Sequence, residues 1–165
     1  MKIVFVFAAL ALSASAQQQE WPQYGGDSGG SKYSKLNQIH RGNVAGLKLA
    51  WEWKTGETAN EQFKTTPGTF QSTPLMIDGV LYFSTPYNRV IAMDAESGKV
   101  IWQYDPKAWE LGQVPNGTGF VHRGVSAWRD PASGNALRIF MNSRTRLICL
   151  EAKSGLPVQT FGDNG

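Results

Sequence analysis

Residues 92–102 have the sequence AMDAESGKVIW, in which an acidic residue, a glycine and a tryptophan are spaced as A-x-D-x-x-x-G-K-x-x-W. A carboxylate at Asp94 can accept hydrogen bonds from the amides of a turn, and Gly98 permits the chain to reverse. The apolar residues on both sides predict an antiparallel hairpin whose outer strand presents the flat face of Trp102 to a neighbour. Taken alone, the segment favours a simple hairpin that has a core tryptophan.

A second, partial copy of this segment follows later in the chain. Residues 148–156, ICLEAKSGL, match residues 91–99, IAMDAESGK, at a separation of 57 residues, with the acidic residue and the glycine at equivalent positions. Gln159 stands where the second tryptophan would be expected. A repeat of this kind indicates a fold built from copies of one small unit.

Short apolar runs separated by turn residues surround both copies. Asp78-Gly79 is a dipeptide typical of a two-residue hairpin turn, because both of its residues tolerate positive φ. The predicted strands are 72–77, 80–84, 89–94 and 99–104 in the first unit, and 124–129, 137–142, 146–150 and 157–161 in the second. Repeated four-stranded antiparallel units predict an all-β fold of the β-propeller type.

Composition excludes several other classes of protein. The 165 residues are 41% hydrophobic, 12% aromatic and 18% charged, which is too apolar for a disordered chain. The single cysteine, Cys149, excludes a disulfide scaffold and a cysteine-rich zinc site, and its apolar neighbours predict an inert core thiol. The formal net charge of +3 comes from scattered residues, so no nucleic-acid partner is expected.

The amino terminus has the pattern of a secretory signal peptide. Met1-Lys2 is followed by the apolar run 3–12 and by small residues at 13–16 that suit cleavage after Ala16. Ten apolar residues are too few to span a bilayer, which needs about 20. We therefore expect a signal peptide at 1–16, an irregular amino-terminal arm with a closing strand (47–54) at 17–70, and two repeat units at 71–165.

The repeat resembles the tryptophan-docking repeat of the quinoprotein dehydrogenases, exported enzymes that use pyrroloquinoline quinone (PQQ). Further segments are similar to that family in order and spacing: WPQYGG (21–26), YS (33–34), Leu36, QSTPL (71–75), LY (81–82), TP (85–86), HRGVSAW (122–128) and FGDNG (161–165). The resemblance implies an eight-bladed propeller of several hundred residues, of which this chain would be the amino-terminal part with about two blades.

The resemblance also implies two cofactor-binding residues. In the family an arginine at the R-G position, here Arg123, contacts the cofactor, and a guanidinium suits the carboxylates and quinone oxygens of PQQ because it can donate two parallel hydrogen bonds. Gln71 stands where family members place a polar or acidic residue near PQQ. From the residues alone, a surface arginine and a solvated glutamine at strand starts are the alternatives. Asn142 is a weaker candidate.

No catalytic or metal-binding residue is expected within the chain itself. The family's Ca²⁺ ligands and its catalytic aspartate would lie beyond residue 165, so this segment alone is expected to be inactive. His40 and His122 show no spacing typical of metal ligands and are interpreted as ordinary loop residues. Alcohol-oxidising relatives carry two adjacent cysteines where Gly117 and Thr118 stand here, which indicates the branch of glucose and other polyol dehydrogenases.

The resemblance thus implies a periplasmic enzyme that oxidises a hydroxyl group of an alcohol, polyol or sugar and passes electrons to a quinone or a cytochrome. A peripheral association with the membrane is compatible with this interpretation. The alternative is a non-catalytic β-propeller scaffold that binds proteins in the cell envelope, although such lipoproteins carry a cysteine at the cleavage site, where Ala16-Gln17 stands here. A third interpretation is a small sugar-binding β domain. The individual substrate, the electron acceptor and the oligomeric state stay open.

Overall fold

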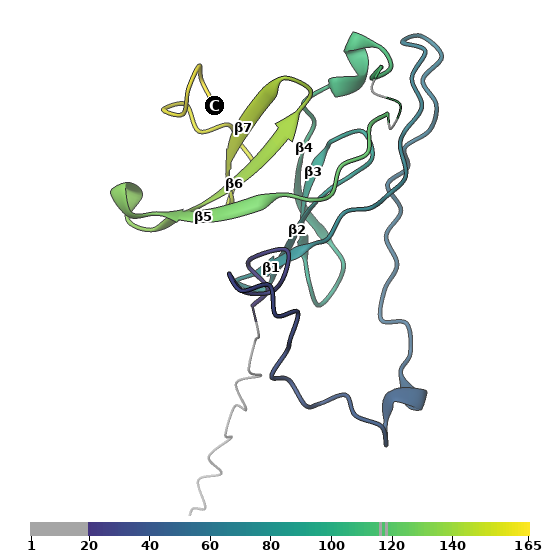
Figure 1. Ribbon diagram of the computed structural model, residues 1–165, viewed down its shortest axis with the longest axis vertical. Coiled ribbons are helices and arrows are strands. Elements are labelled where there is room, and N and C mark those ends of the chain that lie inside the picture. The colour runs from purple at the N-terminus through teal and green to yellow at the C-terminus, as the bar shows by residue number, and fades with distance from the viewer. Residues whose placement is uncertain (1–19, 116, 118) are drawn as a thin grey trace, which may run out of the picture.

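The computed structural model describes residues 20–115, 117 and 119–165, so the predicted signal peptide at 1–16 lies outside the described residues. Two antiparallel sheets lie next to each other, and the amino-terminal arm extends from one end of the molecule (Figure 1). Helical structure in this part consists of three 3-10 turns, η1 (Val44–Gly46), η2 (Ala108–Leu111) and η3 (Pro131–Ser133). None of the helices described is long and apolar enough to cross a membrane. The predicted all-β fold is confirmed.

The first sheet contains four strands in the order in which they occur in the chain. These are β1 (Leu75–Ile77), β2 (Val80–Ser84), β3 (Val90–Asp94) and β4 (Val100–Tyr104). The turn between β1 and β2 has positive φ at both Asp78 (51°) and Gly79 (77°), as a type I′ turn requires. The first predicted four-stranded antiparallel unit is therefore confirmed, although β1 begins three residues later than expected.

An acidic residue closes the turn of each repeat. Asp94 accepts hydrogen bonds from the amide (2.7 Å) and the hydroxyl (2.5 Å) of Ser97. These bonds hold the pKa of Asp94 below its ordinary value of 3.8, because they favour the ionised carboxylate. In the second copy the hydroxyl of Ser154 donates to Glu151 over 3.1 Å. The acidic position of the repeat therefore has the turn-closing function that the sequence predicts.

The second sheet contains three strands, β5 (Ser126–Asp130), β6 (Ala136–Ser143) and β7 (Arg146–Glu151), again in chain order. The predicted fourth strand at 157–161 is wrong. The chain makes one β-bridge there, between Leu150 and Pro157, and then turns, with the amide of Phe161 donating to the carbonyl of Val158. The amide of Cys149 in β7 donates a hydrogen bond to the carbonyl of Gly165. A turn rather than an extended strand therefore lies along this edge of β7.

The predicted strand at 47–54 is also wrong. Among the described residues, this segment makes no backbone hydrogen bonds to either sheet. Instead Trp51 and Trp53 pack on the face of the first sheet that lies away from the second, against the buried cluster of Phe83, Ile91 and Met93. The segment is therefore held by its side chains.

The main core lies between the two sheets and follows the two-residue period of the strands. Its buried members are Leu75, Ile77, Tyr82, Val90 and Ala92 from the first unit and Ile139, Met141, Ile148, Leu150 and Ala152 from the second. Each sheet therefore contributes one apolar face to a shared core.

Two tryptophans pack on turn glycines in the same way, one joining the two units and the other joining the arm to the first unit. The indole N–H of Trp102 donates to the carbonyl of Ala152 (2.8 Å), and its ring lies against Gly155 so closely that a Cβ at this glycine would be 2.5 Å from Cε3 of the ring. The ring of Trp51 lies equally close to Gly98, and its N–H donates to the carbonyl of Ala95. The prediction that Trp102 presents a flat face to the next unit is confirmed.

Candidate functional site

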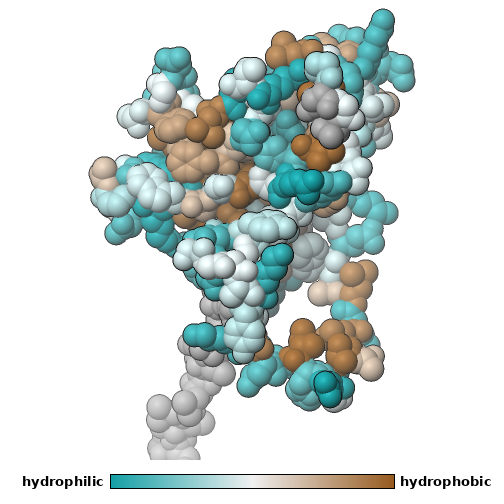
Figure 2. All heavy atoms as spheres, in the orientation of Figure 1, coloured by the Kyte–Doolittle hydropathy of each residue, from teal (hydrophilic) through white to brown (hydrophobic). Residues whose placement is uncertain are grey.

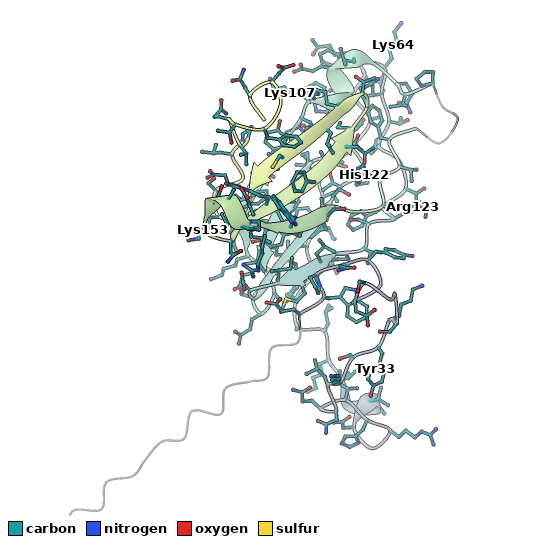
Figure 3. All side chains as sticks on the ribbon, turned by 60° about the vertical axis from the view of Figure 1, so that its left-hand side comes forward. Tyr33, Lys64, Lys107, His122, Arg123 and Lys153 are labelled. Carbon is teal, nitrogen blue, oxygen red and sulfur yellow. The ribbon has the colours of Figure 1, made fainter. Side chains whose placement is uncertain are left out.

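The two predicted cofactor-binding residues lie on segments that are hydrogen-bonded to each other. Gln71 precedes β1 and Arg123 precedes β5, so each lies on the segment that leads into the first strand of its sheet. The amide of Thr73 donates to the carbonyl of Arg123 over 3.0 Å. Both side chains are exposed, and Arg123 points away from the sheets (Figure 3). The fold therefore brings Gln71 and Arg123 to the same end of the two sheets.

The glycine after Arg123 allows this close approach. Gly124 has φ of +137°, a conformation that residues with a side chain rarely adopt. A Cβ at this position would lie 2.9 Å from the carbonyl oxygen of Thr73, which is closer than real Cβ contacts. The R-G pair thus combines a cationic side chain with a backbone that fits tightly against the segment before β1.

His122, directly before Arg123, hydrogen-bonds to both sheets. Its Nδ1 lies 2.8 Å from the hydroxyl of Ser84, the last residue of β2, and its Nε2 lies 2.8 Å from the carbonyl of Asn142 in β6. A carbonyl only accepts hydrogen bonds, so the ring hydrogen is on Nε2. Nδ1 then accepts from the Ser84 hydroxyl and, over 3.3 Å, from the amide of Gly124.

The polar contacts continue into the segment that carries Gln71. The hydroxyls of Ser72 and Ser84 are 3.3 Å apart, and the amide of Ser84 donates to the Ser72 hydroxyl oxygen over 3.2 Å. Sequence reasoning missed both serines. His122 lies in a loop, as the sequence predicts, but its hydrogen bonds to Ser84 and Asn142 were not predicted. Ser84 and Asn142 are distant from His122 in the chain, so the sequence around the histidine, H-R-G, did not indicate these partners.

Among the residues that the structure describes, Arg123 also differs from the neighbouring arginines in lacking a partner for its guanidinium. The other arginines from residue 71 onward have partners: Arg89 with Glu57, Arg129 with Asp78, Arg138 with Asp130 and Glu151, Arg144 with the carbonyls of Ala108 and Gly112, and Arg146 with the carbonyl of Pro106. Within the described residues the guanidinium of Arg123 has no acceptor. Its five N–H donors are therefore free to bind a planar, multiply carboxylated molecule such as PQQ.

The other candidates contribute less to this end of the sheets. The side chain of Asn142 is exposed, and it is the backbone carbonyl of this residue that takes part in the network. Across the described ranges, no group of three His, Cys, Asp or Glu side chains is arranged to hold a metal ion. The chemistry that these residues can provide is thus anchoring of an anionic ligand by Arg123, with hydrogen bonding by the amide of Gln71.

The chain is similar to one family of known proteins. Residues 21–165 match the β-propeller domain of the PQQ glucose/ethanol/alcohol dehydrogenases. The quinoprotein glucose dehydrogenase of Escherichia coli (strain K12) is 35% identical over 171 residues, covering 95% of this chain and 20% of that protein. The quinate/shikimate dehydrogenase (quinone) of Acinetobacter baylyi is 33% identical over 166 residues, covering 90% and 20%.

The fold itself is shared with a solved structure. The crystal structure of quinohemoprotein alcohol dehydrogenase from Comamonas testosteroni matches with a TM-score of 0.66 at 29% identity, over 88% of this chain and 20% of that one. The two sheets described above are thus similar to part of a PQQ β-propeller. The chain spans about one fifth of the length of the relatives it matches.

Proposed function

The chain belongs to the family of PQQ-dependent glucose/ethanol/alcohol dehydrogenase β-propellers, and from this premise we propose that it forms the first two blades of a periplasmic dehydrogenase. The enzyme would oxidise a hydroxyl group of an alcohol, polyol or sugar to a carbonyl. Two relatives whose names refer to glucose and to quinate or shikimate support a polyhydroxylated substrate. The observation that carries the proposal is the acceptor-free guanidinium of Arg123 beside the segment of Gln71.

In this proposal the chain supplies anchors to the cofactor site. Arg123 would bind carboxylate or quinone oxygens of PQQ through parallel hydrogen bonds, and the Gln71 amide can both donate and accept. When bound, PQQ would supply the acceptor for the hydride, with its two electrons, from the substrate's hydroxyl-bearing carbon. A Ca²⁺ ion and a carboxylate base would be held by residues after Gly165, and the electrons would pass to a quinone or a cytochrome.

The first test uses the full-length protein that contains this chain, prepared without cofactor. We expect it in the periplasmic fraction with Gln17 as its first residue. Dye-linked oxidation of glucose, quinate and primary alcohols should appear only after both PQQ and Ca²⁺ have been added, with PQQ alone and Ca²⁺ alone as controls. A full-length protein that does not bind PQQ in an absorbance titration would contradict the proposal.

The second test concerns the anchor itself. Arg123→Ala should weaken PQQ binding by at least about 1.5 kcal/mol, or roughly tenfold, because a charge-assisted hydrogen bond is lost. Arg123→Lys should recover only part of the lost PQQ affinity, since an ammonium group cannot donate two parallel hydrogen bonds. Arg41→Ala, which removes an exposed arginine of the arm, is the control for net charge. Equal affinities of the Arg123→Ala and Arg41→Ala proteins would remove Arg123 from the site.

A further inference from the structure

His122 occupies the junction of the two sheets and the two segments that carry Gln71 and Arg123 (Figure 3). One ring nitrogen bonds Ser84 at the end of β2, and the other bonds the carbonyl of Asn142 in β6. Its imidazole therefore spans the interface between the sheets beside the Arg123 backbone. The function proposed above does not assign any role to this histidine.

The direction of each hydrogen bond in this network follows from two backbone groups, the carbonyl of Asn142 and the amide of Ser84. The carbonyl of Asn142 requires a donor, so Nε2 of His122 carries the hydrogen and Nδ1 is an acceptor. The Ser84 hydroxyl then donates to Nδ1. Because the Ser84 hydrogen is used in that bond, the Ser72 hydroxyl donates to the Ser84 oxygen, and the Ser72 oxygen accepts from the Ser84 amide. Every hydrogen thus has one partner, and Ser84 is fully buried, so the arrangement is well defined.

This network holds the backbone of Arg123 from both sides. Its carbonyl accepts from the amide of Thr73 over 3.0 Å, and the next amide, that of Gly124, donates to Nδ1 of His122 over 3.3 Å. Within the described part of the chain, the exposed side chain of Arg123 has no hydrogen bond or ion pair that would set its direction. Its position is therefore determined by its backbone, and the backbone is held by His122 and Thr73.

We propose that His122 is a positioning residue that sets the spacing of Arg123 and Gln71 before the cofactor binds, an inference that rests on the function proposed above. Through Ser84 it connects to Ser72, the neighbour of Gln71. Holding two binding groups in place beforehand raises affinity because less freedom is lost on binding. His122 acts on PQQ through Arg123 and touches no reacting atom.

The test is a double-mutant cycle in the full-length protein, read out as PQQ affinity by titration. His122→Phe keeps a flat ring but removes both hydrogen bonds. It should weaken PQQ binding about tenfold, the lower end of the range observed when a group that orients a metal ligand is removed. His122→Gln keeps an acceptor and a donor and should restore most of the affinity. In an Arg123→Ala background, His122→Phe should change the affinity less than about threefold, because no guanidinium is left to position.

Ser84→Ala provides a milder variant in case His122→Phe does not fold. It removes the hydroxyl that donates to Nδ1 and should weaken PQQ binding about threefold, again only when Arg123 is present. Equal losses of affinity with and without Arg123 would show a general structural role and overturn the inference. Wild-type protein that binds PQQ while His122→Phe binds it equally well would also overturn it. Wild-type protein that does not bind PQQ contradicts the proposed function instead.

Discussion

Cys149 illustrates how burial determines the chemistry of one side chain. The residue lies within β7 and is 2% exposed. Burial raises the pKa of its thiol above the ordinary value of 9.0, because the thiolate would lose its hydration, and Arg138 opposes this with a smaller lowering effect. The thiol therefore stays protonated around neutral pH. Because the thiolate is the reactive form, both protonation and burial make Cys149 unreactive toward alkylating reagents.

We expect iodoacetamide to leave Cys149 unmodified in the native full-length protein at mildly alkaline pH and to alkylate it in concentrated urea. Raising the pH should increase native labelling only as it approaches the raised pKa, since the thiolate fraction grows with pH. Peptide mass spectrometry of the segment that contains Cys149 gives the measurement. Equal labelling rates in native and unfolded protein would show that the thiol is accessible and contradict this prediction.

The amino-terminal arm is connected to the first sheet by a nearly buried ion pair. The Glu57 side chain, 4% exposed, accepts from Nε of Arg89 over 2.8 Å and from the hydroxyl of Thr85 over 2.5 Å. Its other oxygen accepts from the amide of Tyr87 over 2.9 Å. The Glu57 carboxylate thus holds the arm against the turn between β2 and β3. Loss of either member of the Glu57–Arg89 pair would leave the other charge buried without a partner.

Glu57→Gln should therefore release this part of the arm. We expect the free energy of local opening of residues 55–65, measured by amide hydrogen exchange, to fall by about 3 kcal/mol. Glu52→Gln is the matched control, because Glu52 pairs with Lys54 at the surface, where the side chains are 59% and 85% exposed. Its effect should stay below about 1 kcal/mol. Similar effects of the two substitutions would show that the Glu57 pair does not hold the arm.

Tryptophan–glycine contacts repeat along the chain: one joins the arm to the first sheet, and the next joins the first sheet to the second. Trp51 covers Gly98 and Trp102 covers Gly155, and in each pair the ring occupies the space that a side chain at the glycine would need. Part of the opposite face of the second sheet is exposed, with Trp128 and Leu147 more than half exposed. Figure 2 shows hydrophobic side chains gathered over this sheet. In the proposed enzyme, this face would pack against the next blade.

Gly155→Ala tests the assembly of the two sheets. The new Cβ would lie 2.5 Å from the ring of Trp102 at a φ of +71°, so overpacking adds to backbone strain. We expect a loss of about 3 kcal/mol in the stability of β7, measured by hydrogen exchange. Gly134→Ala is the control, because Gly134 has a φ of +64° with nothing within 4 Å of the Cβ position, and it should cost about 1 kcal/mol. Equal costs would mean that the indole contact does not restrict this position.

Local interactions explain which features could be foreseen from the order of the residues. The turn at Asp78-Gly79, the strand at 80–84 and the Asp94 turn depend on residues within a few positions of each other, and all three are present as predicted. The identity of the docking tryptophan Trp102 followed from the same repeat. The arginine of the R-G pair followed from family resemblance, and its role in PQQ binding stays a prediction.

Contacts between distant segments explain the rest. Residues 47–54 and 157–161 have strand-like composition, but a strand forms only where a partner edge is free, and that depends on the placement of other segments. His122 gained its partners Ser84 and Asn142 only when β2 and β6 came together. Turn propensity is contained in a few neighbouring residues, whereas pairing of edges and side chains across sheets arises only once the chain has folded.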